Sequence, residues 1–418
     1  MAKLKAVYVC TSCGSQHLRW NGNCSQCGEW NTLVEDVIDT SAQAKSESVR
    51  KLSISTVRSL KDVDGKALQR LELGFHEVDR VLGGGLVPGS LVLLAGEPGI
   101  GKSTLLLQLL ENLTSLKEIV YLAGEESVEQ IASRAQRLKL KLDNVSFTTD
   151  VTIESVIALA EERRPDLLVV DSVSVVRAAE VPSVPGSLPQ VRAIIDELMR
   201  FAKTTNTPVV LVGHVTKEGI LAGPKVMEHM VDAVLQLEGQ RYGQLRLLRA
   251  IKNRFGSTQE VGLLQMQHEG LVEVTNPGEL LLKERPKEVM GSVLTVTLEG
   301  NRPFLVEVQA LVTRTHFGYP KRSATGFDPN RLQMLIAVLE KYNKLRLGEY
   351  DVYVNIVGGI KVKETGCDAA IMEAIKSSYE QKLISGREVI YGEVGLDGKV
   401  RDPHSKQLRD QEVLRLLG

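Results

Sequence analysis

A glycine-rich stretch near residue 100 has the residue types and spacing of a phosphate-binding loop. It fits the pattern G-x-x-x-x-G-K-[ST] at every position, follows the apolar run Leu91–Ala95 and precedes a leucine-rich segment typical of a helix. Backbone N–H groups of such a loop cradle phosphates, its lysine reaches the β- and γ-phosphates, and its serine ligates Mg²⁺. The sequence therefore predicts ATP and Mg²⁺ as cofactors. The expected nucleotide-binding residues of the loop are Gly96, Glu97, Pro98, Gly99, Ile100, Gly101, Lys102, Ser103 and Thr104.

Carboxylates follow two further apolar runs that have the length of buried strands. Asp171 ends one run, and the pair Glu125 and Glu126 follows another. Because the carboxyl ends of parallel strands meet at one edge of a sheet, we expect these side chains beside the loop. Asp171 is expected to bind the nucleotide and to hold Mg²⁺ with Ser103, and Glu125 is expected to orient the attacking water. The alternatives are an aspartate that caps the next segment and glutamates that merely decorate a helix start.

A basic stretch at residues 241–256 ends in the sequence Lys-Asn-Arg-Phe-Gly. Lys252 and Arg254 are two positions apart, so on an extended segment both side chains point the same way. A solvated basic face is the ordinary alternative. We expect the pair to be catalytic and to reach a γ-phosphate bound by a neighbouring subunit, where trans-acting arginines contribute ~10³–10⁵ in rate. His214, at another strand end, is either a γ-phosphate sensor or a structural histidine.

Four of the five cysteines form two Cys-x-x-Cys pairs separated by ten residues. Each pair can present two thiolates to one tetrahedral ion, so the pattern predicts a closed structural zinc site, with an iron–sulfur centre as the alternative. Metal binding would supply folding energy of about 10 kcal/mol to a segment too short to stabilise itself by burial. We expect His17 to be a surface loop residue, and Trp20 and Trp30 either to pack around the site or to stack on nucleobases. The expected zinc ligands are Cys10, Cys13, Cys24 and Cys27.

The elements that must position these residues alternate between short apolar runs and helical stretches. The runs are of the kind that forms strands buried on both faces, and their alternation with helices predicts an α/β fold with a mostly parallel, doubly wound sheet. We expect a zinc ribbon at residues 1–35, a polar linker at 36–58, an ATPase domain at 59–275 and a separate α/β domain at 286–418. The predicted core strands are Leu91–Ala95, Ile119–Ala123, Leu167–Val170 and Val209–Val212.

The composition limits the classes of function. The chain has 418 residues, 43% of them hydrophobic, and a formal net charge of −1. No global basic field follows from this balance, so any contact with nucleic acid must come from local patches. No apolar run has the length of a membrane span, and the apolar run Ala6–Cys10 is too short to predict a secretory signal. We therefore expect a cytoplasmic protein without membrane contact.

These features together resemble the RecA-type ATPase class and, more narrowly, the bacterial RadA (Sms) family of DNA repair and recombination proteins. The resemblance is carried by the four-cysteine ribbon, the glycine triplet at residues 83–85 and the Lys-Asn-Arg-Phe-Gly motif at 252–256. It implies a hexameric, DNA-dependent ATPase similar to replicative ring helicases. Such a protein would bind single-stranded and branched DNA, process recombination intermediates and double-strand breaks, and drive branch migration after strand invasion by RecA recombinase, its expected partner. Loops at 177–192 and 216–225 are expected to grip DNA in the ring.

The tail at residues 286–418 resembles the substrate domain of Lon protease. The place of the Lon nucleophile falls near Cys367–Ala370, which contains no serine. Cys367 is either a substitute nucleophile or an inert buried residue, and we expect a scaffold without protease activity. Two other functions stay open for the whole chain: a clock-like or signalling ATPase that switches partners without DNA, and an ATP-dependent protease.

Overall fold

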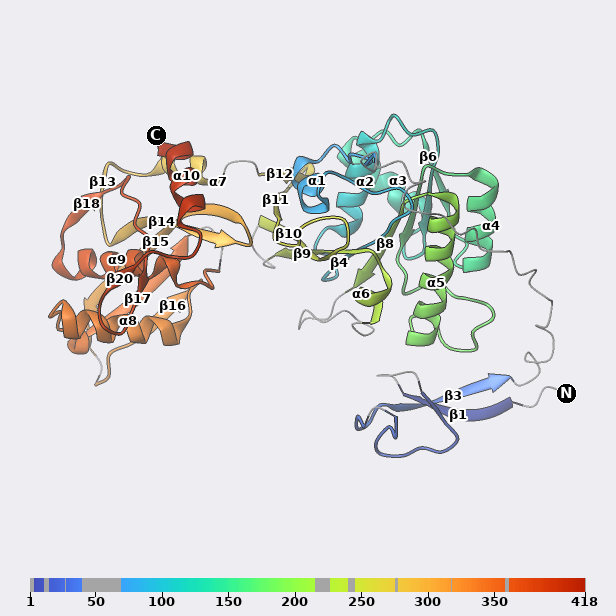
Figure 1. The fold of residues 1–418 in the computed structure, drawn as a ribbon, viewed down its shortest axis with the longest axis horizontal. Helices are drawn as coiled ribbons and strands as arrows, with labels where there is room; N and C mark the ends of the chain where they lie inside the picture. The colour runs from blue at the N-terminus through green and yellow to red at the C-terminus, as the bar shows by residue number, and fades with distance from the viewer. Residues whose placement is uncertain are drawn as a thin grey trace, which may run out of the picture. The chain divides into compact units, whose positions relative to one another are not determined.

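The structure is a computed structural model that describes residues 4–10, 15–26, 28–39, 69–214, 226–239, 245–274, 277–316, 318–357 and 361–417. The chain divides into two compact units (Figure 1). The first comprises residues 1–239, 246–258 and 264–273, and the second comprises 240–245, 259–263 and 274–418. Within the described ranges, no helix is long and apolar enough to span a membrane. The predicted linker at 36–58 falls largely outside the described residues, and the predicted domain boundaries stay predictions.

A large, mostly parallel sheet forms the centre of the first unit. As far as the chain is described it has nine strands, in the order β12-β11-β10-β9-β4-β8-β7-β5-β6. The strands from β9 to β6 in this order are parallel, whereas β10 is antiparallel to β9 and β11 to β12. The bounds are β4 Leu91–Gly96, β5 Ile119–Ala123, β6 Val145–Thr148, β7 Leu167–Asp171, β8 Val209–His214, β9 Ala233–Gly239, β10 Leu245–Asn253, β11 Val261–Gln267 and β12 Gly270–Glu273. The predicted α/β sheet is confirmed.

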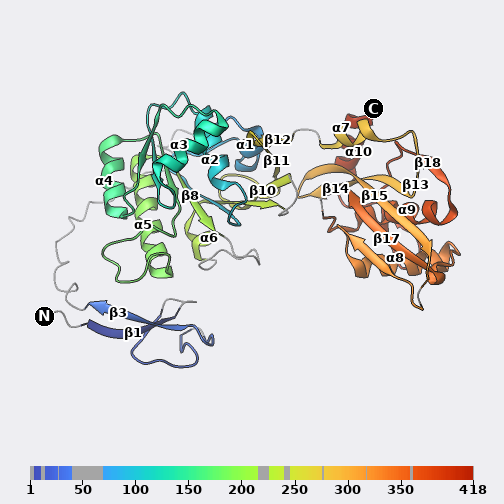
Figure 2. The same ribbon diagram turned by 180° about the vertical axis from the view of Figure 1, so that it is seen from behind.

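Helices cover both faces of this sheet (Figures 1 and 2). Side chains alternate along a strand, so Leu91 and Leu93 of β4 pack in one buried cluster with α4 and α5, while Val92 and Leu94 pack in another with α1 and α2. This two-sided burial explains why the core strands read as continuous apolar runs. The bounds are α1 His76–Leu82, α2 Lys102–Asn112, α3 Val128–Leu138, α4 Ile153–Arg163, α5 Leu188–Thr205 and α6 Val226–Met230.

The cysteine-rich segment forms a small antiparallel sheet in the order β2-β1-β3, counted over the part of it that is described. β1 spans Leu4–Cys10, β2 spans Gln16–His17 and β3 spans Leu33–Asp39. β1 pairs with both neighbours, which places Cys10 at the end of the central strand. This arrangement is that of a ribbon, as predicted.

The second unit has an α/β core of its own. Its main sheet has the order β14-β15-β17-β16 among the described strands, and helix α9 packs against β14 and β15. The tail is thus α/β, as predicted. The bounds are β13 Glu288–Met290, β14 Ser292–Glu299, β15 Arg302–Arg314, β16 Arg322–Thr325, β17 Tyr350–Val357, β18 Leu383–Ser385, β19 Glu393–Val394, β20 Val400–Arg401, α7 Pro277–Glu284, α8 Pro329–Tyr342, α9 Asp368–Glu380 and α10 Lys406–Leu417, with 3₁₀ turns at Leu347–Glu349 and Thr365–Cys367.

Candidate functional site

The phosphate-binding loop joins the end of β4 to the start of α2. Its backbone requires glycine: Gly101 has φ 116°, and a Cβ at this position would lie 2.7 Å from Cε of Met266. A Cβ on Gly96 would lie 2.8 Å from the carbonyl oxygen of Leu237. These glycines let the loop turn closely against its surroundings while its N–H groups gather at the helix N-terminus. The loop therefore fits a bound phosphate group.

Lys102 is the buried cation of this loop. Its Nζ donates hydrogen bonds to the carbonyl oxygens of Gly96, at 2.9 Å, and Glu97, at 3.1 Å. Burial lowers the pKa of Lys102, while the carboxylates of Asp171 and Glu125 raise it. The three predicted residues Lys102, Asp171 and Glu125 are thus within electrostatic reach of one another, at the carboxyl edge of the sheet where the sequence places them. This is the donor set that a nucleotide with Mg²⁺ requires.

Asp171 ends β7 and is held by two hydroxyl groups. Tyr121 on the neighbouring strand β5 donates a hydrogen bond of 2.6 Å to Oδ2 of Asp171. Burial raises the pKa of Asp171, whereas the hydrogen bonds from Tyr121 and Ser103 lower it. Ser103 and Asp171, the two predicted magnesium ligands, are therefore close enough to interact. Sequence reasoning missed Tyr121 because an aromatic residue in an apolar run is expected in the core.

The two adjacent glutamates have different surroundings. Glu125 accepts hydrogen bonds from the hydroxyls of Ser172 and, at 3.3 Å, Ser174, both just after β7. Glu126 instead forms an ion pair of 2.5 Å with Arg134 on α3. Only Glu126 fits the alternative of a charge that decorates a helix. Of the two acids, Glu125 is the one that raises the pKa of Lys102, so it lies within electrostatic reach of the loop.

The first two residues of the Lys-Asn-Arg-Phe-Gly segment end β10, and the last three form the turn that follows it. β10 ends at Asn253, and its pairing with β9 is irregular between Ala250 and Lys252. Nζ of Lys252 donates to the carbonyl oxygens of Glu228, at 2.6 Å, and Val231, at 2.8 Å, near the end of α6. Both burial and the nearby Arg254 lower the pKa of Lys252. The cation is thus bound to backbone oxygens of its own chain.

Arg254 is bound to the same region through a buried carboxylate. Its Nη1 lies 3.1 Å from Oδ1 of Asp232, and its backbone N–H donates to the carbonyl oxygen of Asp232 at 3.0 Å. Lys252 is in the strand and Arg254 is in the turn, and both side chains contact one stretch, residues 228–232. Asp232 was not identified from the sequence, where a lone aspartate between apolar residues gives no signal of its own.

The other residues of the turn dock it onto helix α1. The side-chain amide of Asn253 donates to the carbonyl oxygen of Leu82 at 3.2 Å, and Arg70 donates to the carbonyl oxygen of Phe255 at 2.7 Å. A Cβ on Gly256 would lie 3.5 Å from the same Leu82 oxygen, so the turn approaches α1 closely. Each residue of the motif therefore has a contact that keeps the turn in place.

The loop and the turn lie at opposite ends of the strands. Gly96, at the carboxyl end of β4, is paired with Leu237, whereas the other end of β9 is paired with Asn253. At about 3.3 Å per residue, the five steps from Leu91 to Gly96 separate the two ends by ~17 Å. Arg254, which contacts Asp232 just before β9, therefore cannot reach a phosphate bound by its own loop.

Several predicted positions are only partly described. His214 pairs through its backbone with Gly96, and its side chain lies outside the described residues. The loop at 216–225 is also outside them. The predicted loop at 177–192 was too long: α5 begins at Leu188, with Ser187 as its extended N-cap, so the loop ends there. The buried amide of Gln190 on α5 binds the backbone of Ala178, Val181 and Ser183, which holds this loop against the helix.

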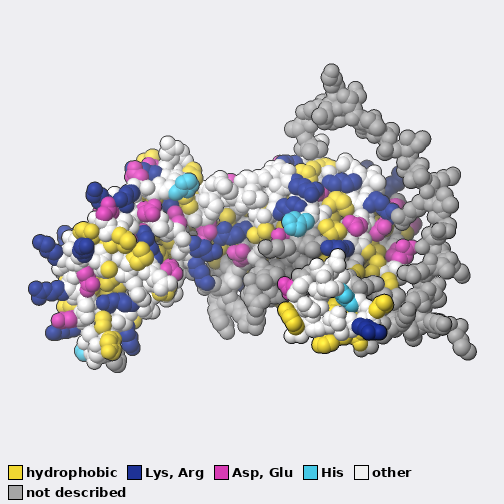
Figure 3. Space-filling view, turned by 60° about the horizontal axis from the view of Figure 1, so that its bottom comes forward, with side chains coloured by type: hydrophobic (Ala, Val, Ile, Leu, Met, Phe, Trp, Pro, Cys, Tyr) yellow, Lys and Arg dark blue, Asp and Glu magenta, His cyan; other side chains and the backbone are white. Residues whose placement is uncertain are grey.

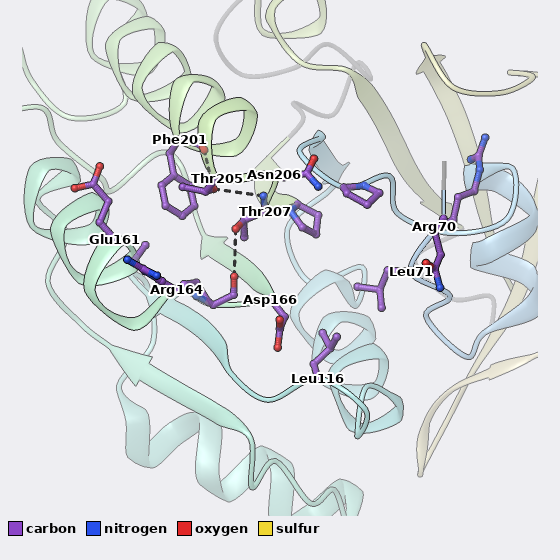
Figure 4. A pocket seen from close by; sticks show the side chains of 15 residues that line it. Arg70, Leu71, Leu116, Glu161, Arg164, Asp166, Phe201, Thr205, Asn206 and Thr207 are labelled. Carbon is purple, nitrogen blue, oxygen red and sulfur yellow. Dashed lines mark hydrogen bonds between the residues drawn. The ribbon is translucent and has the colours of Figure 1, made fainter. Parts of the chain in front are cut away.

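A cavity of about 1030 Å³ opens at the amino ends of the strands (Figure 4). Arg164 and Glu161 lie on one side of it, and Arg70 and Leu71 on the other. It is lined by none of the predicted nucleotide-binding residues. The nucleotide site is thus distinct from this cavity.

Two of the predicted zinc ligands are described. Cys10 and Cys24 are buried in one cluster with Leu33, and Cys13 and Cys27 lie outside the described residues. Sγ of Cys24 lies 3.0 Å from the hydroxyl of Ser15, and Sγ of Cys10 lies 3.2 Å from that of Thr32. Buried sulfurs with hydroxyl neighbours, brought together from two separate turns, fit the thiolate donor set of a zinc ribbon.

Three further residues of the ribbon can now be located. His17 is in β2 and half-buried, with Nε2 3.4 Å from Sγ of Cys24, so the prediction of a surface loop residue was wrong. Trp20 and Trp30 are 56% and 72% exposed, which leaves their rings largely accessible. On the face drawn in Figure 3, Lys and Arg side chains are interspersed with Asp and Glu, in keeping with the near-zero net charge.

Comparison with known proteins identifies the family. Residues 63–219 match the AAA domain family, and residues 8–35 match a family described as a rubredoxin metal binding domain. The chain is 46% identical to the DNA repair protein RadA of Pseudomonas aeruginosa, over 99% of this chain and 91% of that protein. It is 44% identical to the DNA repair protein RadA of Bacillus subtilis, over 100% and 92%.

The chain belongs to the DNA repair protein RadA family. The AAA match indicates an ATP-hydrolysing domain that uses a nucleotide and Mg²⁺, and the ribbon match supports Zn²⁺ at the N-terminus. Among solved structures, a RadB recombinase is 23% identical with a TM-score of 0.39, covering 49% of this chain and 99% of that one. A KaiC-like protein of Pyrococcus horikoshii is 16% identical with a TM-score of 0.41, covering 50% and 100%.

Proposed function

We propose that this RadA family member is a DNA-dependent ATPase that assembles into a hexameric ring and hydrolyses ATP between adjacent subunits. It would bind single-stranded and branched DNA, process recombination intermediates and double-strand breaks, and drive branch migration of strand-exchange products made by RecA recombinase. RecA is the expected protein partner, and the cytoplasm is the expected location.

The observation that carries this proposal is the separation of the two charged sites. The phosphate-binding loop lies at the carboxyl end of β4, whereas Arg254 lies ~17 Å away at the amino end. From this position Arg254 would reach only a nucleotide held by another subunit. A second copy would then complete the proposed active site, and a closed ring would supply one to every subunit.

Each predicted residue would then have one task. Bound ATP would supply the γ-phosphoryl group, and Mg²⁺ would neutralise its charge. Lys102 would bind phosphate oxygens, and Ser103 and Asp171 would hold the metal. Glu125, held by the hydroxyls of two serines after β7, would orient a water and accept its proton. Lys252 and Arg254 would act on the same phosphate from the next subunit.

The near-neutral charge of the chain is compatible with DNA as a partner. In a ring, a few cations per subunit line the pore six times over, so a global basic field is unnecessary. Backbone contacts of this kind would make binding sensitive to salt and weakly dependent on sequence. The relatives are DNA repair proteins, which supports DNA as the substrate of the proposed motor.

The decisive experiment measures the ATPase rate without DNA, with single-stranded DNA and with branched DNA, each at two salt concentrations. We expect stimulation by both DNAs that weakens at the higher salt. A chain that stayed monomeric with nucleotide and DNA, yet hydrolysed ATP at full rate, would contradict the proposal. Extension of RecA-made joint molecules, with and without added protein, tests branch migration separately.

A further inference from the structure

We propose that Asp232 is a positioning residue that pre-organises Arg254 for the nucleotide of the neighbouring subunit. This inference rests on the proposed action of Arg254 in trans. The reason for it is the number of separate elements that meet at this one carboxylate, which is 2% exposed.

Asp232 joins three parts of the fold. Oδ2 accepts hydrogen bonds from the backbone N–H of Leu91 at 3.1 Å and from Nζ of Lys203 on α5 at 2.9 Å. Oδ1 accepts from Nη1 of Arg254 at 3.1 Å. The backbone N–H of Asp232 donates to the carbonyl oxygen of Leu91 at 2.9 Å. The carboxylate is thus fixed to the first residue of the strand that ends in the phosphate-binding loop.

Arg254, the partner of this carboxylate, is held on one side only. The side chain of Arg254 is 54% exposed, although one of its nitrogens contacts a carboxylate that is almost fully buried. A guanidinium has five N–H donors, so a single contact on one edge leaves donors for an outside acceptor. Because one edge of the guanidinium is already fixed and the other is open, Arg254 could bind a phosphate with little further loss of side-chain entropy.

The surroundings of Arg254 support the same reading. Nζ of Lys203, which shares the carboxylate, lies 6.0 Å from the centroid of the Phe255 ring. The backbone N–H of Arg254 is bound by the carbonyl oxygen of Asp232, so main chain and side chain are tied to one residue. Loss of the charge at position 232 would therefore free the guanidinium while the backbone turn stays docked.

The test is a mixing experiment in which the two halves of the active site come from different chains. A minority of chains carries Lys252→Ala and Arg254→Ala and keeps a working loop. An excess carries Lys102→Ala and supplies the cations, which should restore turnover. When the excess chain also carries Asp232→Asn, we expect the restored kcat to fall by about 10–100-fold, with the KM for ATP unchanged.

The controls separate positioning from general stability. Asp232→Asn placed in the minority chain should leave the restored rate unchanged, because that chain supplies only the loop. Asp166→Asn in the excess chain is the matched substitution: Asp166 also precedes a strand and accepts backbone N–H groups, yet contacts neither cation. It should leave the restored rate unchanged.

Each unfavourable outcome has its own meaning. A full restored rate with Asp232→Asn in the excess chain, or an equal loss from either chain, would overturn the positioning role. No restoration even by Lys102→Ala alone would overturn action in trans, and with it this inference. Should Asp232→Asn fail to assemble by sedimentation, Asp232→Glu keeps the charge and shifts it by one methylene group. Asp232→Glu should lower the restored rate when the excess chain carries it and should leave that rate unchanged when the minority chain carries it. The same loss in both cases would overturn the positioning role of Asp232.

Discussion

A hydrogen bond between Arg246 and Ile100 joins β10 to the phosphate-binding loop of the same chain. β10 is the strand that carries Lys252 and leads into the turn with Arg254. Nε of Arg246 donates a hydrogen bond of 3.2 Å to the carbonyl oxygen of Ile100, which lies within the loop. Arg246 is near the start of β10, and Lys252 is near its end. A single strand therefore contacts one nucleotide site and presents the cations proposed for the next.

Lys102→Ala should abolish ATP turnover, because the variant loses the buried ammonium that would bind the phosphates. Removing one such charge-stabilising donor costs on the order of 10²–10³ in rate. Lys117→Ala, an exposed lysine before β5, is the matched control and should hydrolyse ATP normally. A steady-state phosphate-release assay decides. Normal turnover in Lys102→Ala would end the assignment of the loop.

Glu125→Gln and Glu126→Gln should differ sharply. Glu125 contacts the serines after β7, so its loss should lower kcat by about 10²–10⁴, the contribution of a general base, with nucleotide binding retained. Glu126 is bound to Arg134 at a partly exposed site, so its loss should cost at most ~1 kcal/mol of stability and little activity. Single-turnover hydrolysis and binding of a fluorescent nucleotide measure the two effects. Equal losses in both variants would contradict the distinction.

Lys252→Ala should lower the ATPase rate and regain part of it in mixed rings with Lys102→Ala chains. Each variant has the half of the site that the other lacks, and trans-acting cations contribute up to ~10³–10⁵ in rate. Arg249→Ala, a cation of the same strand that pairs with Glu238, should retain turnover. Titration of one variant into the other gives the measurement. Absence of any rescue across all mixing ratios would count against action in trans.

A strong chelator should release about one zinc ion per chain and unfold the ribbon. The expected stoichiometry follows from four thiolates in one tetrahedral shell. Cys10→Ser should lower the zinc content, whereas Cys367→Ala, which changes a cysteine of the second unit, should retain it. Elemental analysis of the purified chain measures the metal. Its complete absence from freshly purified protein would refute the zinc assignment.

Cys367 should be chemically inert and should make the chain less stable at high pH. Its side chain is fully buried, and burial raises the pKa of its thiol from an ordinary 9.0 to about 12. The thiol of Cys367 has a higher pKa in the folded chain than in the unfolded chain. The contribution of the buried neutral thiol to stability is therefore complete below pH 9 and is lost as pH rises from 9 to 12. Between pH 8 and 10, wild type should lose about 1.4 kcal/mol more unfolding free energy than Cys367→Ala.

Denaturant titrations of the two proteins at both pH values measure this difference, since all other groups titrate alike in both. Equal losses would show that the thiol is not buried in solution. The same burial argues against a nucleophile at this position, so casein should remain undigested by wild type and Cys367→Ala alike. Digestion by the wild type but not by Cys367→Ala would support the alternative hypothesis of a protease with Cys367 as its nucleophile.

The sequence by itself determined the features that depend on neighbouring residues. The phosphate-binding loop is one continuous segment, and its spacing indicates strand, turn and helix without knowledge of the rest. The apolar runs predicted β4, β5, β7 and β8 to within one or two residues at their ends, because a strand buried on both faces must be apolar throughout. The cysteine pairs likewise indicate a ribbon from spacing alone.

Only the tertiary structure decided which side chains meet across the sheet. Asp232 and Arg254 are 22 positions apart, and Tyr121 and Asp171 are 50 apart. Such pairs depend on strand order and register, which no local pattern contains. The same is true of the ~17 Å between the loop and the turn, because the direction of β10 relative to β9 sets it. Contacts of this kind distinguish the residues predicted to bind a nucleotide from the residues proposed to act on the nucleotide of a neighbouring subunit.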